Sequence, residues 1–170
     1  GLKVKYLAAN PDPGTAGDVW YDGAAFALKG FVGRAAWSAG SSLTYDVQQC
    51  ASGGTPTAGW ITGGLTNPTN DALNDTSEYN GSGWAASGDY PVAIRNLHGL
   101  GTQTAAWAGG GSPTTVNANE YDGTSWAESP DMPTAKGDFA ACGTQTAGLQ
   151  WGGTSDPPQL TETLEYDGSS

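Results

Sequence analysis

The sequence has few positively charged residues, with six Lys and Arg against 17 Asp and Glu in 170 residues, a net charge of −11. Phosphate binding needs clustered Lys and Arg, so this deficit argues against a nucleic-acid partner. It argues in the same way against an anionic membrane surface. No apolar run approaches the roughly 18 residues of a membrane-spanning helix. We therefore expect no nucleic-acid partner and no membrane insertion.

Cysteine and histidine, which build metal sites and disulfides, are also scarce. The two cysteines, Cys50 and Cys142, are fewer than a disulfide framework normally shows, and their counterparts in the repeats described below are mostly apolar. We interpret both as small core residues. His98 is the single histidine, and no catalytic triad can be built around it. The sequence predicts no metal, no cofactor and no enzymatic activity.

Glycine and aromatic residues are abundant instead. The chain contains 27 Gly, 10 Pro, 7 Trp, 7 Tyr and 3 Phe, and 14% of its residues are charged, against roughly 25% in an average soluble domain. Disordered chains lack so many large apolar side chains. A folded chain that is rich in glycine and poor in charge favours many short strands and tight turns, so the sequence predicts an all-β protein.

One motif recurs along the chain. It is Glu-Tyr-Asn-Gly-Ser-Gly-Trp at 78–84 and Glu-Tyr-Asp-Gly-Thr-Ser-Trp at 120–126, and it recurs up to the residue before the Trp at 165–170. Asn-Gly and Asp-Gly predict a hairpin turn, because these residues tolerate the positive φ that tight turns need. The Tyr before and the Trp after each turn should then pack as a pair across two strands.

A second motif follows each Trp at a constant spacing, and a glycine pair comes a few residues after it. The motif is Gly-Thr-Pro-Thr-Ala in the first unit and Gly-Thr-Gln-Thr-Ala in the next two. It predicts a second strand pair, which ends at the glycine pair because the chain bends closely past its neighbours there. Trp37, Trp84 and Trp126 are 47 and 42 residues apart. A period of this length with four strands in each repeat is typical of a β-propeller blade.

These repeats divide most of the chain into units at 31–77, 78–119 and 120–164, with the start of a fourth at 165–170. Three units and an opening hairpin cannot close a propeller of the usual four to eight blades, unless other chains complete it. We expect the chain to be the front of a longer protein, and we expect a homo-oligomer. The repeat framework consists of Trp37, Trp60, Gly63, Gly64, Tyr79, Gly81, Trp84, Trp107, Gly110, Gly111, Tyr121, Gly123, Trp126, Gly152, Gly153, Tyr166 and Gly168.

The third unit resembles a kelch repeat in the order of Tyr121, Trp126, Met132-Pro133, Gly143 and Gly152-Gly153. Kelch repeats have Tyr and Trp about six residues apart, whereas here they are five apart, and Met-Pro occurs only in the third unit. Over residues 31–170, the sequences of these motifs are similar to those of kelch-like structural proteins of marine bacteriophages, especially of cyanobacterial hosts. The resemblance implies kelch-type β-propeller blades in a virion structural protein of the tail-fibre or surface-appendage type.

Residues 1–30 do not fit the repeat. Asn-Pro-Asp-Pro-Gly at 10–14 favours a turn, and residues 18–21 and 26–29 flank an Asp-Gly pair as in a separate hairpin. This stretch resembles short modules at the front of phage virion proteins. It is either an edge strand that caps the blades or an attachment segment that binds other virion proteins.

Three connections between a glycine pair and the next Glu-Tyr vary in length, at 65–77, 112–119 and 154–164. Rigid scaffolds present binding groups on such loops. Short polar side chains can hydrogen-bond hydroxyl-rich ligands such as surface glycans, although plain solvated loops have the same composition. The candidate ligand residues are Asn67, Thr69, Asn70, Thr114, Thr115, Asn117, Ser155 and Asp156.

The function expected from the resemblance is attachment to a virion and presentation of the repeats, with recognition of a glycan or protein on the host surface. One alternative is a head-decorating or other non-receptor virion component. A second is a secreted bacterial propeller that binds or modifies carbohydrate. Some kelch-like propellers resemble the galactose oxidase group, which binds copper through Tyr and His, and a chain with one histidine lacks the convergent imidazoles of such a site.

Overall fold

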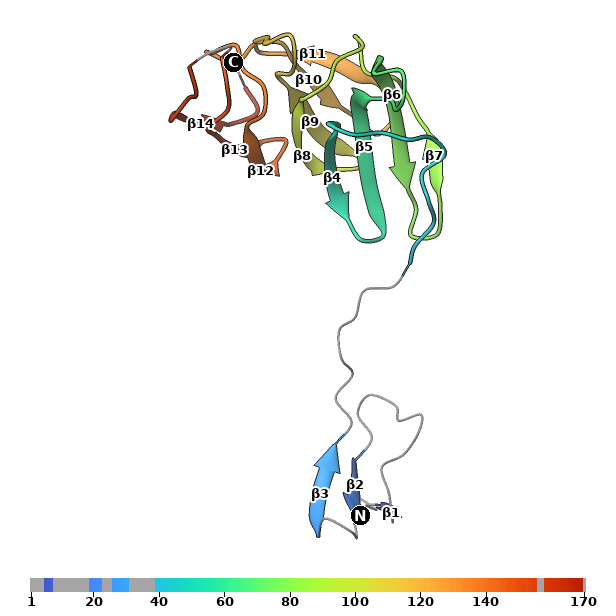
Figure 1. Cartoon of the computed structure of the whole chain (residues 1–170). Coiled ribbons are helices and arrows are strands. Elements are labelled where there is room, and N and C mark those ends of the chain that lie inside the picture. Colours follow the sequence, from blue (N-terminus) through green and yellow to red (C-terminus); the bar gives the residue numbers. More distant parts are fainter. Residues whose placement is uncertain (1–4, 8–18, 23–25, 31–38, 156–157, 170) are drawn as a thin grey trace. The chain divides into compact units, whose positions relative to one another are not determined.

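The computed structural model describes residues 5–7, 19–22, 26–30, 39–155 and 158–169. The chain consists of two units, Gly1–Ala39 and Gly40–Ser170, drawn in Figure 1. The described residues form strands, turns and bends, with no helix among them. The predicted all-β class is therefore confirmed.

The first unit contains a three-stranded sheet. Strands β2 (Val19–Asp22) and β3 (Ala27–Gly30) are antiparallel, which confirms the predicted hairpin, and Trp20 is buried. Strand β1 (Lys5–Leu7) pairs with β2 in parallel. The sequence did not predict β1, because three residues are too few to show the alternation of apolar and polar side chains that indicates a strand.

The second unit contains three antiparallel sheets in which neighbouring strands follow chain order. Sheet 1 consists of β4 (Ala51–Thr55), β5 (Ala58–Leu65), β6 (Ala72–Tyr79) and β7 (Trp84–Ala86). Sheet 2 consists of β8 (His98–Thr102), β9 (Ala105–Gly109), β10 (Ala118–Tyr121) and β11 (Trp126–Ser129). Sheet 3 consists of β12 (Ala140–Thr144), β13 (Ala147–Trp151) and β14 (Thr163–Tyr166).

The sheets are offset by one hairpin from the sequence units. Each Tyr-to-Trp hairpin pairs with the strand that precedes it, so β6 and β7 complete sheet 1 and β10 and β11 complete sheet 2. The sequence boundaries at 77/78 and 119/120 therefore fall inside β6 and β10. The offset leaves the repeat period unchanged.

The three sheets pack in series. Strand β8 contacts β4 of sheet 1 and β12 of sheet 3, and Figure 1 shows these first strands side by side. One buried cluster between sheets 1 and 2 contains Trp60, Tyr90 and Tyr121, and a second between sheets 2 and 3 contains Trp107 and Phe139. The described strands of the second unit remain three separate sheets and do not close into a ring.

Candidate functional site

The repeated hairpins have the predicted cross-strand pairs. Tyr79 is in register with Trp84, and the centroids of their rings are 5.1 Å apart. Tyr121 is likewise in register with Trp126, with ring centroids 4.9 Å apart. The prediction that each Tyr packs against the Trp beyond the turn is confirmed for both pairs.

Each turn has four residues, 80–83 and 122–125, and the first two have different roles. The glycines take the positive φ, which is 90° at Gly81 and 96° at Gly123. The Asn or Asp before them accepts hydrogen bonds, and Asp122 Oδ1 accepts from the backbone N–H groups of Thr124 and Ser125, each at 2.8 Å. Hydrogen bonds from the Thr124 hydroxyl and from these N–H groups lower the pKa of Asp122 to about 2.

The second motif joins neighbouring sheets through its glutamine. The amide nitrogen of Gln103 donates to the carbonyl oxygens of Gly59 and Tyr79 in sheet 1, at 3.2 and 3.1 Å. Gln145 makes the equivalent bonds to Ala106 and Tyr121 in sheet 2, at 2.9 and 3.2 Å. Sheet 1 has Pro56 at this position, whose ring cannot donate such a bond.

The Glu-Tyr motif makes a second contact between sheets. The Tyr121 hydroxyl donates to Glu78 Oε1 in sheet 1 at 2.5 Å, and the Tyr166 hydroxyl donates to Glu120 Oε1 in sheet 2 at 2.7 Å. Burial, with the neighbouring carboxylate, raises the pKa of each tyrosine to about 12. Both phenols therefore stay protonated and able to donate at physiological pH.

The glycine pairs allow a close backbone approach. A Cβ atom at Gly111 would lie 2.8 Å from the Arg95 carbonyl oxygen, and one at Gly153 would lie 2.8 Å from that of Gly137. The pairs at 110–111 and 152–153 follow their strands as predicted, whereas Gly63 and Gly64 lie inside β5 at an irregularity in its register. Gly168 again takes the positive φ of its turn.

The remaining framework positions differ in burial. Trp60 and Trp107 are almost fully buried, with 1% of each residue exposed. Leu149, at the same position of sheet 3, is half-buried. Trp37 lies outside the described residues. The framework residues thus mainly hold the sheets to one another.

The first variable connection is shorter than the sequence suggests, because β6 begins at Ala72 and leaves residues 66–71 as the loop. Asn67, Thr69 and Asn70 are exposed in this loop. The Thr69 and Thr66 hydroxyls hydrogen-bond each other at 2.7 Å. None of the three candidates belongs to the lining of the recess formed by the described parts of the other two connections.

The second and third connections meet at a polar recess of about 300 Å³, which we call the loop recess. It is lined by Gly111, Ser112, Pro113, Thr114, Gly137, Asp138 and Thr154. Thr114 is the one sequence-predicted ligand residue in this lining. Thr115, Asn117 and Ser155 belong to the same connections but do not line the recess, and Asp156 lies outside the described residues.

Backbone hydrogen bonds hold the walls of the loop recess. The Ser112 N–H donates to the Arg95 carbonyl oxygen at 2.7 Å, and the Thr154 N–H donates to that of Gly137 at 2.9 Å. The Lys136 N–H donates to the Thr115 carbonyl oxygen at 3.2 Å. The recess is therefore formed by anchored loops, which lowers the entropy that a ligand must remove on binding.

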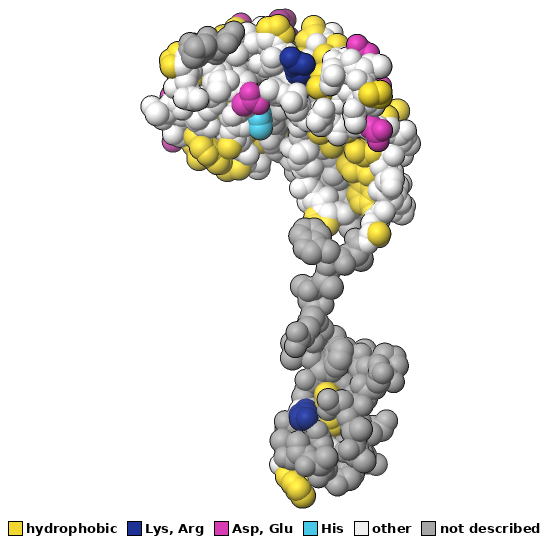
Figure 2. All heavy atoms as spheres, viewed as in Figure 1, with side chains coloured by type: hydrophobic (Ala, Val, Ile, Leu, Met, Phe, Trp, Pro, Cys, Tyr) yellow, Lys and Arg dark blue, Asp and Glu magenta, His cyan; other side chains and the backbone are white. Residues whose placement is uncertain are grey.

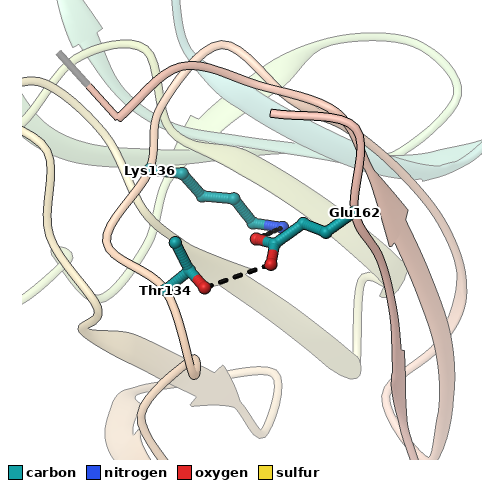
Figure 3. Close-up of polar contacts among 3 residues, drawn as sticks. All are labelled: Thr134, Lys136 and Glu162. Atoms are coloured by element: carbon teal, nitrogen blue, oxygen red, sulfur yellow. Dashed lines mark hydrogen bonds and ion pairs between the residues drawn. The ribbon is translucent and has the colours of Figure 1, made fainter. Parts of the chain in front are cut away.

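Figure 3 shows an ion pair between the buried Lys136 and the partly exposed Glu162. The Lys136 side chain is fully buried, and its Nζ is 3.4 Å from Glu162 Oε1 and 5.0 Å from the centroid of the Phe139 ring. The Thr134 hydroxyl donates to Glu162 Oε2 at 3.1 Å. Sequence reasoning missed this pair. The available signal was a lysine at the position that Ile94 occupies in the preceding repeat.

His98 and the cysteines do not form a reactive cluster. The His98 ring packs on Phe139 with centroids 4.9 Å apart, and burial lowers the pKa of His98 while Asp138 opposes this shift. Both cysteines are free thiols. Cys50 is half-buried, whereas Cys142 is exposed, so the interpretation of Cys142 as a core residue is wrong. Leu100, at the same position of sheet 2, is buried because sheet 3 covers it.

Among the described residues, no three His, Cys, Asp or Glu side chains are grouped so that they could hold a metal ion. In the same part of the chain, no helix is long and apolar enough to span a membrane. Figure 2 shows charged side chains scattered over a mostly uncharged face of the second unit. No known family model and no curated protein matches this sequence.

Proposed function

We propose that this protein is a structural component of a bacteriophage virion, of the tail-fibre or surface-appendage type. In this proposal the three sheets are kelch-type β-propeller blades, residues 1–30 attach the protein to other virion proteins, and the blades present a binding surface. The protein acts by attachment and recognition and performs no chemistry.

The blade interpretation is supported by contacts that repeat from sheet to sheet. Gln103 and Gln145 make the same pair of bonds to the preceding sheet, and Tyr121 and Tyr166 donate to equivalent glutamates. Sheets 2 and 3 are each joined to the preceding sheet by the same hydrogen bonds. Such an array is stiff in the way that stacked repeats are. Such stiffness suits a protein that holds its loops away from a particle.

The loop recess is the observation that favours recognition. Ser112, Thr114 and Thr154 offer hydroxyl and backbone groups, and Asp138 offers an exposed carboxylate. Hydroxyls both donate and accept hydrogen bonds, and a carboxylate accepts them, so the recess suits a ligand rich in hydroxyl groups. We therefore propose a glycan of the host surface as the ligand.

A glycan array tests the recognition step. The 170-residue protein should bind a subset of bacterial surface glycans, and Thr114→Val should weaken that binding about fivefold to tenfold, because it removes one hydrogen-bonding hydroxyl at similar volume. Thr69→Val is the matched control, since Thr69 lies outside the recess, and it should bind like the native protein. Equal binding by all three proteins would refute the recess as the site.

Mass spectrometry of purified particles tests the virion assignment. Peptides from this protein should be found in intact particles and should be lost when residues 1–30 are deleted. Absence from particles, together with turnover of a sugar substrate, would instead favour the secreted carbohydrate-modifying propeller. Normal incorporation of the truncated protein would exclude residues 1–30 as the attachment segment.

A further inference from the structure

A cavity of about 210 Å³ lies where sheet 2 packs against sheet 3. Its wall includes Trp107 from β9, Tyr166 from β14 and Gln150 from β13, with Met132 and Ser169 from adjoining segments. Cavities of about 150 Å³ with apolar walls already bind benzene. This cavity is therefore large enough for an aromatic ring.

The equivalent space between sheets 1 and 2 is filled by the indole ring of Trp126. The centroid of that ring is 5.7 Å from Trp60, 5.1 Å from Tyr90 and 4.9 Å from Tyr121. Counted along the repeats, these three partners correspond to Trp107, Met132 and Tyr166. All three equivalent residues line the cavity. The interface between sheets 2 and 3 therefore has the residues that surround an indole ring in the first interface, but the space for the ring is open.

The polar end of this space has its own hydrogen-bond acceptor. In the filled interface, Trp126 Nε1 donates to Thr76 Oγ1 at 3.0 Å. The residue equivalent to Thr76 in sheet 2 is Ala118, which has no side-chain acceptor. Gln150 is 3% exposed, and its Oε1 has no hydrogen-bond partner in the part of the chain that the structure describes. A buried acceptor without a partner costs free energy until a donor reaches it.

We propose that this cavity is a binding site for an indole ring, held as Trp126 is held between sheets 1 and 2. Ser170 is equivalent to Ser125, which precedes Trp126, so a tryptophan attached experimentally to Ser170 delivers an indole ring to the cavity. The incoming ring packs against Trp107, Met132 and Tyr166, and its N–H donates to Gln150 Oε1. This inference does not rest on the proposed virion function.

The test extends the native chain without altering residues 1–170. One variant carries Trp-Ala-Glu-Ser after Ser170, which copies Trp126–Ser129, and its matched control carries Ala-Ala-Glu-Ser. The Trp extension should raise the melting temperature by about 5 °C over the control, because it buries an aromatic ring. It should also slow amide hydrogen exchange in β14 about tenfold, while the Ala extension leaves both close to the native values.

Two further measurements identify the cavity as the place of binding. Free indole should bind the native chain and the Ala extension but not the Trp extension, whose cavity is already filled. Gln150→Leu should remove part of the melting-temperature gain in the Trp extension. Equal melting temperatures for the two extensions, or indole binding that the Trp extension leaves unchanged, would overturn the proposal.

Discussion

At the scale of single residues, the Lys136–Glu162 pair is a departure from the repeat. Ile94 occupies the equivalent position in the preceding repeat and is buried there, so the third repeat places a charge in an apolar environment. Glu162 and the Phe139 ring offset the loss of hydration of that charge. Removing the carboxylate would leave the ammonium group buried without its counter-charge.

Glu162→Gln should therefore destabilise the protein by about 1–3 kcal/mol, which is less than for a fully buried pair because Glu162 is partly exposed. Chemical denaturation of the native protein and the variant measures this difference. Glu128→Gln is the matched control, since Glu128 is exposed on β11, and its stability should stay within about 0.5 kcal/mol of native. Equal effects of the two substitutions would contradict a structural role for the pair.

The turn at Asp122 predicts a pH dependence with a definite sign. The pKa of Asp122 is lowered to about 2 from an ordinary value of 3.8, so the folded state favours the ionised form. The stabilisation is present above pH 3.8 and is lost as the pH falls through 2. Asp122→Asn keeps an acceptor that does not titrate. The native protein should lose stability relative to this variant between pH 4 and pH 2, and parallel pH profiles in thermal denaturation would contradict the assignment.

At the scale of elements, the glutamine of the second motif hydrogen-bonds its own sheet to the preceding sheet. Gln145→Ala removes two hydrogen bonds from sheet 3 to sheet 2 and should cost about 1–2 kcal/mol in chemical denaturation. Amide exchange should rise first in β12 and β13. Gln159→Ala, at an exposed position of the third connection, should have little effect. Faster exchange that begins in sheet 1 would contradict a local contact of Gln145 between sheets 2 and 3.

The elements that the sequence predicted are those whose structure is determined by residues close together in the chain. The hairpins at 78–84 and 120–126 are specified by an Asx-Gly turn between a Tyr and a Trp, so their register follows from a few adjacent residues. The contacts of Gln103 and Gln145 depend on which sheet packs against which, and no local pattern encodes that. The sequence likewise could not predict the loop recess, because Thr114 and Thr154 come together only through packing. Thr114 was the one residue of its lining among the predicted ligand residues.

At the scale of the whole molecule, the exposed face of sheet 3 gives a simple chemical test. Cys142 is exposed on β12, whereas Cys50 is half-buried and burial raises the pKa of its thiol. The thiolate is the reactive form, so Cys142 should react with a thiol reagent at pH 8 about tenfold faster than Cys50. Peptide mapping after brief labelling measures both. Preferential labelling of Cys50 would mean that another surface covers sheet 3.

The central claim of this account is that the repeated motifs join the three sheets in series. A double-mutant cycle between Tyr121→Phe and Glu78→Gln tests it most directly, because the two side chains lie on different sheets and touch through one hydrogen bond. We predict a coupling free energy of about 1–2 kcal/mol for this pair. The cycle between Tyr121→Phe and Glu120→Gln, whose side chains make no such bond, should be additive. Additive effects in both cycles would contradict the claim that the Glu-Tyr motif holds sheet to sheet.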